Sequence, residues 1–310
     1  MSEEKKERWI FIVNPISGNR FGETMVPVIR EKLKQFNIDG DVVVTERPCH
    51  ATELSKEAAE KGYKYIIAVG GDGTLNEVAR SLVNIKDVVT GIIPAGTGND
   101  FNQIPGFPDR FREKDWEVFF SKNIVGHDVG VINGTYFLNG LGIGFDAEVA
   151  AQNYTEEGLV RKGGNDKYYW HIIKTLLFFR EKNIKITTPE TSFETTCFMN
   201  TISIGRRFAA DFFLTPKAIA NDGLLDVCSI RKVNLFHRFR LLLKVPKGTH
   251  ITDKRVNYFT TPSLTIEFPV RVPFHVDGEI GFGEKFDISL IPNALNIIYN
   301  PDGNHYYKRG

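Results

Sequence analysis

Short apolar runs and longer segments with helical periodicity alternate through the first 125 residues. Each run is long enough for a buried strand and too short for a helix. Strands that alternate with helices predict a parallel sheet with helices on its faces, and such sheets bind ligands at the carboxyl ends of their strands. The expected strands are Trp9–Val13, Asp41–Thr45, Tyr65–Val69 and Val88–Ile93.

The pattern changes near Gly126, where closely spaced strands and turns replace the alternation of strand and helix. Asn133-Gly134 between two apolar segments predicts a tight hairpin, and the strands after it predict an antiparallel β-sandwich. Two helices are expected within this region, at Lys167–Glu181 and Leu235–Val245. The further strands are expected at Ile184–Thr188, Phe193–Ile204, Leu224–Ile230, Asn257–Thr260, Leu264–Phe268, Val270–Val276 and Phe286–Ile291.

The composition is typical of a soluble globular protein, with 42% hydrophobic and 25% charged residues. A net charge of +1 argues against a nucleic-acid partner, so any basic surface has to be local. No apolar run reaches the roughly 18 residues that predict a membrane-spanning helix. Cys49, Cys197 and Cys228 lie far apart without metal-ligand spacing, and we expect buried thiols in a reducing compartment.

A glycine-rich turn, Gly70-Gly71-Asp72-Gly73, follows the third expected strand. Thr74 and Glu77 have the spacing of a capping box, which predicts that a helix begins there. A strand, a glycine turn and a helix N-terminus together direct backbone N–H groups at one point, which suits a phosphate. The alternative is a tight turn without a ligand. The acid within the turn is unusual, because an anion near phosphate repels it unless the acid holds a metal, orients a donor or accepts a proton.

A second glycine-rich turn, Pro94–Phe101, follows the fourth expected strand. Gly96 and Gly98 open its backbone, and Thr97, Asn99 and Asp100 add short polar side chains. Because loops with such side chains at neighbouring strand ends often bind ligands, the two turns together predict a binding site. The alternative is a surface loop without a ligand.

Two further polar clusters lie in the expected β-sandwich. Asn221–Asp226 offers oxygen atoms to a hard cation, and it is equally typical of a turn that enters a strand. In His275–Glu279, Asp277-Gly278 is a hairpin signal. The carboxylates of Asp277 and Glu279 are two residues apart, so on an extended strand they would share one face and suit acid–base or metal chemistry. The alternative is a solvated turn.

Two predicted helices have residue patterns that indicate what their surfaces contact. Tyr168–Phe179 is aromatic at one end and mostly apolar, which favours packing on the sandwich or a groove for an apolar substrate. Basic residues surround the second helix, where they form either a solvated face or a surface that attracts anionic lipid. These residues are Arg231, Lys232, His237, Arg238, Arg240, Lys244 and Lys247.

Five motifs in this order resemble the diacylglycerol kinase catalytic family, which includes bacterial lipid kinases and sphingosine kinases. They are Asn14–Gly18, Gly70–Glu77, Pro94–Phe101, Asn221–Asp226 and Asp277–Glu279. The resemblance covers nearly the whole chain. The Gly-Gly-Asp-Gly-Thr loop is also similar to those of NAD kinases and phosphofructokinases, whereas the Gly-Thr-Gly-Asn-Asp-Phe turn resembles the lipid kinases alone.

The resemblance implies an α/β nucleotide domain with a parallel sheet, at residues 1–125 with 293–310 returning to it, and a lipid-binding antiparallel β-sandwich at residues 126–292. It places ATP in the cleft between them. It implies that Asp277 or Glu279 accepts a proton with help from Asp72. Mg²⁺ would be held by Asp222 and by carbonyls of Ile219 and Leu224. The implied nucleotide-binding residues are Asn14, Pro15, Ile16, Ser17, Gly18, Thr45, Gly70, Gly71, Asp72, Gly73, Thr74, Leu75, Asn76 and Thr97.

The resemblance implies an ATP-dependent lipid kinase that transfers the γ-phosphoryl group to a lipid hydroxyl, as a step of phospholipid metabolism. A diacylglycerol-like acceptor is favoured, and phosphatidylglycerol or a sphingoid lipid stays open. Alternatives are an NAD kinase-like enzyme and a non-catalytic protein that senses nucleotide or lipid. We expect a cytoplasmic protein, peripheral at the inner face of the membrane, that meets its lipid substrate at the membrane surface. The oligomeric state stays open, with a homodimer as one alternative.

Overall fold

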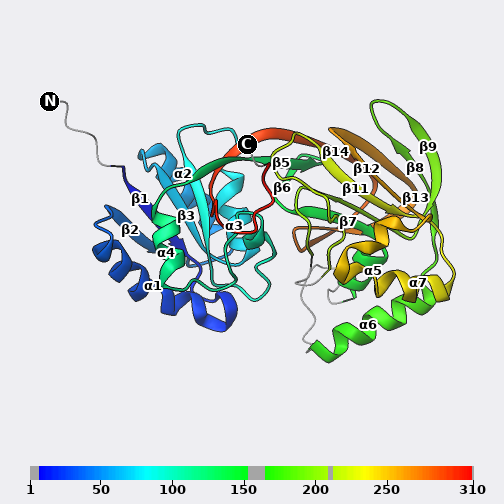
Figure 1. The fold of residues 1–310 in the computed structure, drawn as a ribbon, viewed down its shortest axis with the longest axis horizontal. Helices are drawn as coiled ribbons and strands as arrows, with labels where there is room; N and C mark the ends of the chain where they lie inside the picture. The colour runs from blue at the N-terminus through cyan, green and yellow to red at the C-terminus, as the bar shows by residue number, and fades with distance from the viewer. Residues whose placement is uncertain (1–6, 153–164, 209–211, 309–310) are drawn as a thin grey trace. The chain divides into compact units, whose positions relative to one another are not determined.

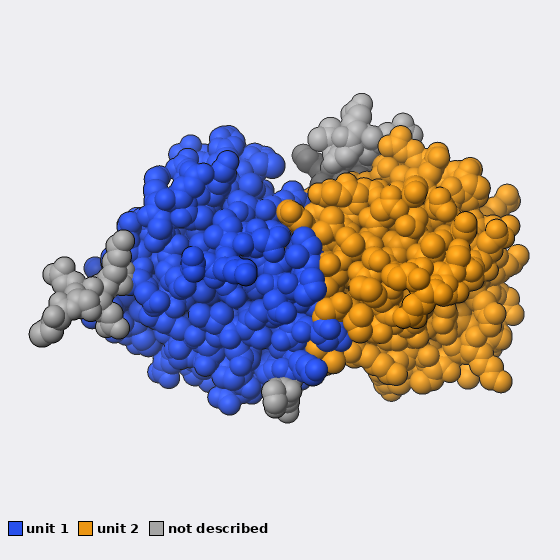
Figure 2. All heavy atoms as spheres, turned by 90° about the horizontal axis from the view of Figure 1, so that it is seen from above, with its two compact units in different colours: residues 1–129, 220–222, 291–310 blue, residues 130–219, 223–290 orange. Residues whose placement is uncertain are grey.

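The computed structural model describes residues 7–152, 165–208 and 212–308. The chain divides into two compact units, which Figure 2 colours separately. Unit 1 comprises residues 1–129, 220–222 and 291–310, and unit 2 comprises residues 130–219 and 223–290. Among the described residues, no helix is both long enough and apolar enough to cross a bilayer.

Unit 1 is built on parallel strands in the order β14–β4–β3–β1–β2, of which Figure 1 labels β1, β2, β3 and β14. Strand β14 (Glu279–Ile298) belongs to this unit from residue 291 onward. The first four strands along the chain are β1 (Trp9–Val13), β2 (Gly40–Val44), β3 (Tyr65–Gly70) and β4 (Val89–Pro94), which confirms the expected alternation. The helices are α1 (Ser17–Gln35), α2 (His50–Glu60), α3 (Asp72–Arg80), the short 3₁₀ helix η1 (Asp100–Gln103) and α4 (Glu113–Phe120).

Both faces of this parallel sheet are covered by helices, so its central strands are buried along their whole length. On one face, Phe11 and Ile67 form a core with residues of α1 and α4, including Ile29 and Phe119. Side chains at the alternate strand positions point to the opposite face, where α2 and α3 contact each other and the strands. The carboxyl ends of these strands therefore emerge from a rigid, buried framework.

Unit 2 is built on antiparallel strands in the order β12–β11–β10–β7–β13–β14. Hairpins β5–β6 and β8–β9 extend it, and the chain forms the antiparallel domain that the sequence predicted. The strands are β5 (Ile124–Ile132), β6 (Thr135–Phe137), β7 (Gly140–Gly144), β8 (Lys182–Thr187), β9 (Ser192–Cys197), β10 (Met199–Ser203), β11 (Leu225–Ile230), β12 (Val256–Thr261), β13 (Ser263–Val276) and β14 (Glu279–Ile298). The helices are α5 (Phe145–Ala151), α6 (Asn165–Phe178), α7 (Leu235–Leu242) and the 3₁₀ helices η2 (Val245–Lys247) and η3 (Thr249–Thr252).

In unit 2, sequence signals for turns predicted the hairpins correctly, whereas the ends of several strands were predicted incorrectly. Asn133 and Gly134 both have positive φ between β5 and β6, as the expected hairpin requires. The expected strand Phe193–Ile204 is instead two strands, β9 and β10, that pair with different partners. The two strands expected on either side of Pro269 form one strand, β13, because a register shift between Glu267 and Val272 accommodates the proline.

The prediction of three buried thiols was wrong for Cys49, which is exposed, while Cys197 and Cys228 are buried. Burial raises the pKa of the Cys228 thiol to about 12, and it raises that of Cys197 well above its usual value. We expect one thiol per chain to react quickly with a disulfide reagent at neutral pH and three to react after unfolding, because the thiolate is the reactive form. Fast reaction of two or three thiols in the native protein would contradict this arrangement.

Candidate functional site

The loops that follow β1 and β3 are tied together at the carboxyl end of the parallel sheet in unit 1. Asn14 Nδ2 donates to Thr74 Oγ1 at 3.1 Å, and the backbone N–H of Asn14 donates to the carbonyl of Val69 at 2.9 Å. Asn14 Oδ1 also accepts from the N–H of Ile16 at 3.3 Å. The side chain of Asn14 therefore joins the first motif to the glycine loop, and two of the predicted nucleotide-binding segments meet.

Three glycines of these loops pack backbone against backbone. A Cβ on Gly18 would lie 2.2 Å from the carbonyl oxygen of Ala95, and a Cβ on Gly96 would lie 2.4 Å from the Cα of Gly71. Contacts this close exclude any side chain at either position. Gly18 also has φ 57°, and Asn19 and Arg20 after it are left-handed too. These glycines bring the loops after β1, β3 and β4 into direct contact.

Gly73 differs from the glycines that pack the loops. It is exposed in the first turn of α3, and a Cβ built on it would meet nothing within 4 Å. The loop geometry therefore does not require a glycine here. Open space above the N-terminus of a helix is where a bound anion would accept backbone hydrogen bonds. Gly73 is thus a position at which the structure has room for a side chain.

Asp72 lies in the first turn of α3 and joins the two glycine-rich loops. Its Oδ2 accepts from the N–H of Asp100, and its Oδ1 accepts from the N–H of Phe101, both at 3.0 Å. A carboxylate at the N-terminal end of a helix is also favoured by the helix dipole. The acid within the loop thus orients backbone donors, one of the three roles that sequence reasoning left open. Its part in proton transfer stays a prediction.

The predicted capping box was wrong. Helix α3 begins at Asp72, and the side chain of Thr74 bonds to Asn14 instead of capping the helix. The Glu77 carboxylate accepts from the N–H groups of Cys49 and Ala51, at 3.1 and 3.2 Å, so it caps the start of α2. The Thr-x-x-Glu spacing is present in the sequence, but both side chains form hydrogen bonds with residues distant in sequence instead of capping α3.

Two residues outside the implied nucleotide-binding set fix the loop after β4. Asn99 is buried with φ 51° and forms two hydrogen bonds of 3.1 Å with the backbone of Gly96. The Arg110 guanidinium donates to the Gly96 carbonyl at 2.9 Å and lies over the ring of Phe21. Asn99 belongs to a quoted motif, whereas Arg110 is an exposed loop residue in no motif. No local sequence signal marks Arg110.

The other predicted nucleotide residues occupy the same edge of the sheet. Thr45 directly follows β2, and its N–H donates to the Val13 carbonyl at 2.8 Å. Thr97 is exposed between Gly96 and Gly98. Leu75 and Asn76 are buried side chains of α3, so they anchor the helix that follows the Gly70–Gly73 turn. The remaining predicted residues, Pro15, Ile16, Ser17 and Gly70, lie in or next to the contacts described above.

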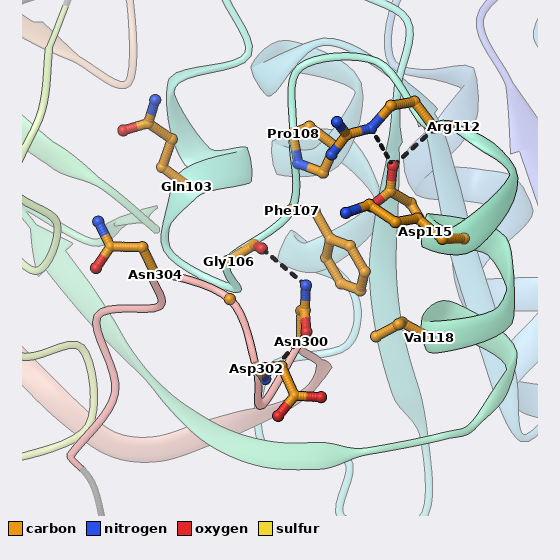
Figure 3. Close-up of a pocket in the computed structure, with 12 residues that line it drawn as sticks. Gln103, Gly106, Phe107, Pro108, Arg112, Asp115, Val118, Asn300, Asp302 and Asn304 are labelled. Carbon is orange, nitrogen blue, oxygen red and sulfur yellow. Dashed lines mark hydrogen bonds and ion pairs between the residues drawn. The ribbon is translucent and has the colours of Figure 1, made fainter.

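A hollow of about 580 Å³ in unit 1 lies apart from these loops (Figure 3). Figure 3 shows Gly106, Asn300 and Asp302 close together, with Arg112, Asp115 and Val118 on the side of α4. The Asn300 side chain donates to the Gly106 carbonyl at 3.3 Å. None of the predicted nucleotide-binding residues lines this hollow.

In unit 2, Asp277 and Gly278 form the two-residue turn between β13 and β14, with φ 45° and 90°. This confirms the hairpin that Asp-Gly predicted. The Asp277 carboxylate accepts from the N–H groups of Leu138, Asn139 and Gly140 at 2.7–3.0 Å. Three backbone donors hold this carboxylate in place, and its part in proton transfer stays a prediction.

Asp277 and Glu279 do not share a strand face, and that expectation was wrong. Asp277 lies in the turn with left-handed φ and bonds to the segment before β7, whereas Glu279 is the exposed first residue of β14. His275, which the sequence grouped with them, is 3.1 Å from an oxygen of Asp146 on α5. The structure therefore places these three side chains in three different settings, although the sequence presented them as one cluster.

The expected metal ligands lie in a turn before β11. Gly223 has φ 80°, and the Asn221 side-chain oxygen accepts from the N–H of Lys308 at 2.7 Å. Residues 220–222 cluster with unit 1 and their neighbours with unit 2, so Ile219, Asp222 and Leu224 are divided between the units. Within the described ranges no group of three or more His, Cys, Asp or Glu side chains could hold a metal. The metal site therefore stays a prediction.

Comparison with known proteins identifies the same two parts. Residues 8–132 match the diacylglycerol kinase catalytic domain, and residues 139–299 match the YegS C-terminal NAD kinase beta sandwich-like domain. A protein named diacylglycerol kinase from Bacillus subtilis (strain 168) is 28% identical over 271 residues, 87% of this chain and 89% of that protein. A protein named "Probable lipid kinase YegS-like" from Enterobacter sp. (strain 638) is 29% identical over 283 residues, 89% of this chain and 92% of that protein.

A solved structure described as a diacylglycerol kinase from Bacillus anthracis (strain Sterne) is 25% identical, with a TM-score of 0.75 over 96% of this chain and 98% of that one. Both family domains and the whole fold are therefore shared. The chain belongs to the lipid kinases that join a diacylglycerol kinase catalytic domain to a YegS-type C-terminal β-sandwich domain.

Proposed function

We propose that the protein transfers the γ-phosphoryl group of ATP to the hydroxyl of a diacylglycerol-like lipid, with unit 1 binding the nucleotide and unit 2 the lipid. Its membership of a kinase family carries the proposal, together with the open glycine position above the N-terminus of α3. The names of the similar proteins favour a lipid acceptor, and the first of them names diacylglycerol.

The loops of unit 1 would bind the phosphates through their backbone. The exposed Gly73 lies in the first turn of α3, where a Cβ would meet nothing within 4 Å, and the helix dipole adds a partial positive charge at this end of the helix. Asn14, Asp72 and Asn99 hold the loops in place. Because phosphoryl transfer depends mainly on positioning and charge stabilisation, loops held this way could supply much of the rate.

Glu279 is our choice of proton acceptor among the three acids. The hydrogen bonds of Asp72 and Asp277 to backbone N–H groups support positioning roles for these two acids, and the choice of Glu279 rests on its exposure and its place in the chain. Glu279 is exposed at the start of β14, directly after the turn that Asp277 fixes. We propose that Glu279 accepts the proton of the attacking lipid hydroxyl, that Asp277 positions it, and that Asp72 keeps the two glycine-rich loops together.

We also propose Mg²⁺ near Asp222, where it would neutralise charge and support the turn. The segment offers one carboxylate and backbone carbonyls, and Mg²⁺ binds through one or two carboxylates while it keeps several waters. The donor set therefore fits, with Asp222 as the carboxylate.

Magnesium at millimolar concentration should raise the melting temperature by a few degrees, because an ion that binds only the folded state stabilises it. Asp222→Asn should lose this increase, and Asp302→Asn, which changes an exposed carboxylate in another turn, should keep it. Thermal unfolding with and without Mg²⁺ measures the difference. An unchanged response in Asp222→Asn would contradict the site.

An acceptor panel tests the proposed function. Labelled ATP is incubated with diacylglycerol, monoacylglycerol, phosphatidylglycerol, ceramide, sphingosine and NAD in turn. We expect label in a lipid product, with diacylglycerol the best acceptor. NAD is included because the C-terminal domain is described as NAD kinase-like, and label in NAD alone would replace the lipid assignment. ATP binding without any transfer would favour a non-catalytic sensor.

A further inference from the structure

Exposed apolar side chains of the described residues are concentrated on one part of unit 2. Fourteen large apolar side chains are exposed, and eight of them lie on α6, on α7 or at the residue that ends α7. In Figure 1 these two helices lie side by side, and they contact each other. The eight residues, which we call the α6–α7 surface, are Trp170, Ile173, Leu177, Phe178, Leu235, Phe236, Phe239 and Leu243.

Helix α7 is apolar on two opposite faces. Leu241 and the following Val245 are buried in the core of unit 2. Phe236, Phe239 and Leu243 recur at helical spacing on the other face, and Phe236 and Leu243 are 71% and 78% exposed. A surface helix of a globular protein normally has polar residues on the face away from the core. The exposed apolar face of α7 therefore indicates contact with an apolar partner outside the chain.

Helix α6 repeats this arrangement. Ile172 and Leu176 are buried in the same core, whereas Trp170, Ile173 and Leu177 recur on the exposed side. Trp170 is 63% exposed. Two neighbouring helices thus expose apolar stripes at the same time. An extended apolar surface on a folded protein usually marks a site of interaction with a protein or a membrane.

Arg238 locks the two helices together. Its guanidinium donates to the carbonyls of Leu176 and Phe179 at the end of α6 and pairs with Glu181 at 2.8 Å. Both charged side chains are more than 90% buried. Arg238 is therefore not part of a basic face, and including it in the basic cluster was wrong. It gives the α6–α7 surface a fixed geometry.

The charge around this surface is positive. Residues 231–252 contain six lysines and arginines and no aspartate or glutamate, although the whole chain has a net charge of only +1. One of these cations, Arg240, lies between the exposed Phe236 and Leu243 in sequence, and a further cation, Lys174, lies beside Ile173 on α6. Both cations are exposed, as are Arg231, Lys232 and Lys247.

We infer that the α6–α7 surface docks on an anionic lipid bilayer, with its apolar side chains in the acyl boundary and its cations at the headgroups. Apolar residues flanked by lysine and arginine suit this arrangement. A second copy of the chain is disfavoured, because two such faces would bring like charges together. The inference names the partner of the proposed lipid kinase and rests on that function for its purpose, since the acceptor would be reached within the bilayer.

Trp170 provides a direct test. The other two tryptophans of the chain, Trp9 and Trp116, are 1% and 3% exposed. We expect phosphatidylcholine vesicles with about 30% phosphatidylglycerol and brominated acyl chains to quench the emission of Trp170, without ATP or acceptor present. Quenching should be much weaker with phosphatidylcholine alone and should weaken with added salt. In Trp170→Phe the lipid-dependent quenching should disappear.

Paired variants separate the apolar and the electrostatic contributions. Phe236→Ser with Leu243→Ser should lower vesicle affinity on the order of 100-fold, because each side chain loses its burial in lipid. Lys174→Gln with Arg240→Gln should lower affinity for anionic vesicles by roughly 25-fold, about fivefold per cation. Val270→Ser, which changes an exposed apolar residue on β13, and Lys56→Gln, in α2, are the matched controls and should bind as the wild type does. Circular dichroism confirms that each variant is folded.

The outcomes distinguish this inference from the proposed function. Vesicle binding without phosphoryl transfer would contradict the kinase proposal and leave the docking surface standing. Transfer to a short-chain, monomeric diacylglycerol without vesicle binding would overturn the docking surface alone. If Phe236→Ser with Leu243→Ser binds vesicles normally, or instead dissociates a dimer seen by sedimentation, the membrane assignment is wrong.

Discussion

Glu279→Gln is expected to lower the rate of phosphoryl transfer by about 10²–10⁴-fold, the usual contribution of general acid–base catalysis. Glutamine keeps the size and the hydrogen-bonding reach of the side chain but cannot accept the proton. A base acts only when the acceptor hydroxyl attacks, so ATP affinity should stay unchanged. Single-turnover rates and an equilibrium measurement of ATP binding separate the two effects. Glu284→Gln, an exposed carboxylate on the same strand, is the matched control and should retain full activity.

Asp277→Asn should lose activity in a different way. The asparagine places an amide where three backbone N–H groups now meet a carboxylate. Hydrogen bonds to charged groups contribute about 1.5–3 kcal/mol, so this variant should also be less stable and should melt at a lower temperature. If Asp277→Asn is inactive but as stable as the wild type, and Glu279→Gln is active, then Asp277 is the proton acceptor and Glu279 is not. If Asp277→Asn, Glu279→Gln and Asp72→Asn are all fully active, none of these three acids is the proton acceptor.

Gly73→Ala is expected to weaken ATP binding while it stabilises the folded protein. Alanine in the first turn of α3 meets no atom within 4 Å, and a helix gains roughly 0.5–1 kcal/mol when alanine replaces glycine. The methyl group would occupy the space into which the phosphates are proposed to fit. A misfit of one such group costs about 1–3 kcal/mol, which is roughly 5- to 150-fold in affinity.

Gly98→Ala is the control for this prediction, because a Cβ there makes an ordinary contact of 3.7 Å with Asp72. Gly71→Ala is not suitable, since its Cβ would lie 3.1 Å from the Cα of Gly96 and would disturb the loop itself. Calorimetric titration with ATP and a thermal melt give both quantities for each variant. If Gly73→Ala binds ATP as tightly as the wild type does, the phosphates do not lie at the start of α3.

Features of the fold that depend on neighbouring residues could be predicted from the sequence. The apolar runs Trp9–Val13 and Tyr65–Val69 are strands because each is a short buried segment, and Asp277-Gly278 forms its turn because both positions take positive φ. The glycine loops could be recognised for the same reason, since their chemistry lies in consecutive residues. Sequence reasoning therefore found the edge of the sheet where the candidate site lies.

The partners of the polar side chains could not be predicted, because they come from distant parts of the chain. Asp72 bonds to backbone groups 28 and 29 residues away, and Asp277 to one 139 residues away. A carboxylate on a loop looks the same in sequence whether it holds a metal, accepts a proton or fixes another loop. Three-dimensional contacts alone show that Asp277 holds the backbone of residues 138–140.

The length of β14 was missed for a related reason. Gly281 and Gly283 are residues that usually weaken a strand, so only Phe286–Ile291 carried a strand signal. In the structure Gly281 pairs directly with Phe274 on β13, and a Cβ on this glycine would lie 2.5 Å from the phenylalanine ring. The aromatic ring covers the glycine and maintains the strand. Cross-strand packing of this kind is invisible to a local pattern.

The most direct test of the central claim follows the phosphorus atoms of ATP. Wild-type protein and Glu279→Gln are incubated with diacylglycerol in mixed micelles and with ATP labelled at either the γ or the α phosphorus, and the lipid product is separated and counted. We predict that γ label appears in a phosphorylated lipid with the wild type, that α label does not, and that Glu279→Gln transfers neither at a comparable rate. The proposed lipid kinase activity is contradicted if γ label never enters a lipid and is instead found in NAD, in free phosphate or in unchanged ATP.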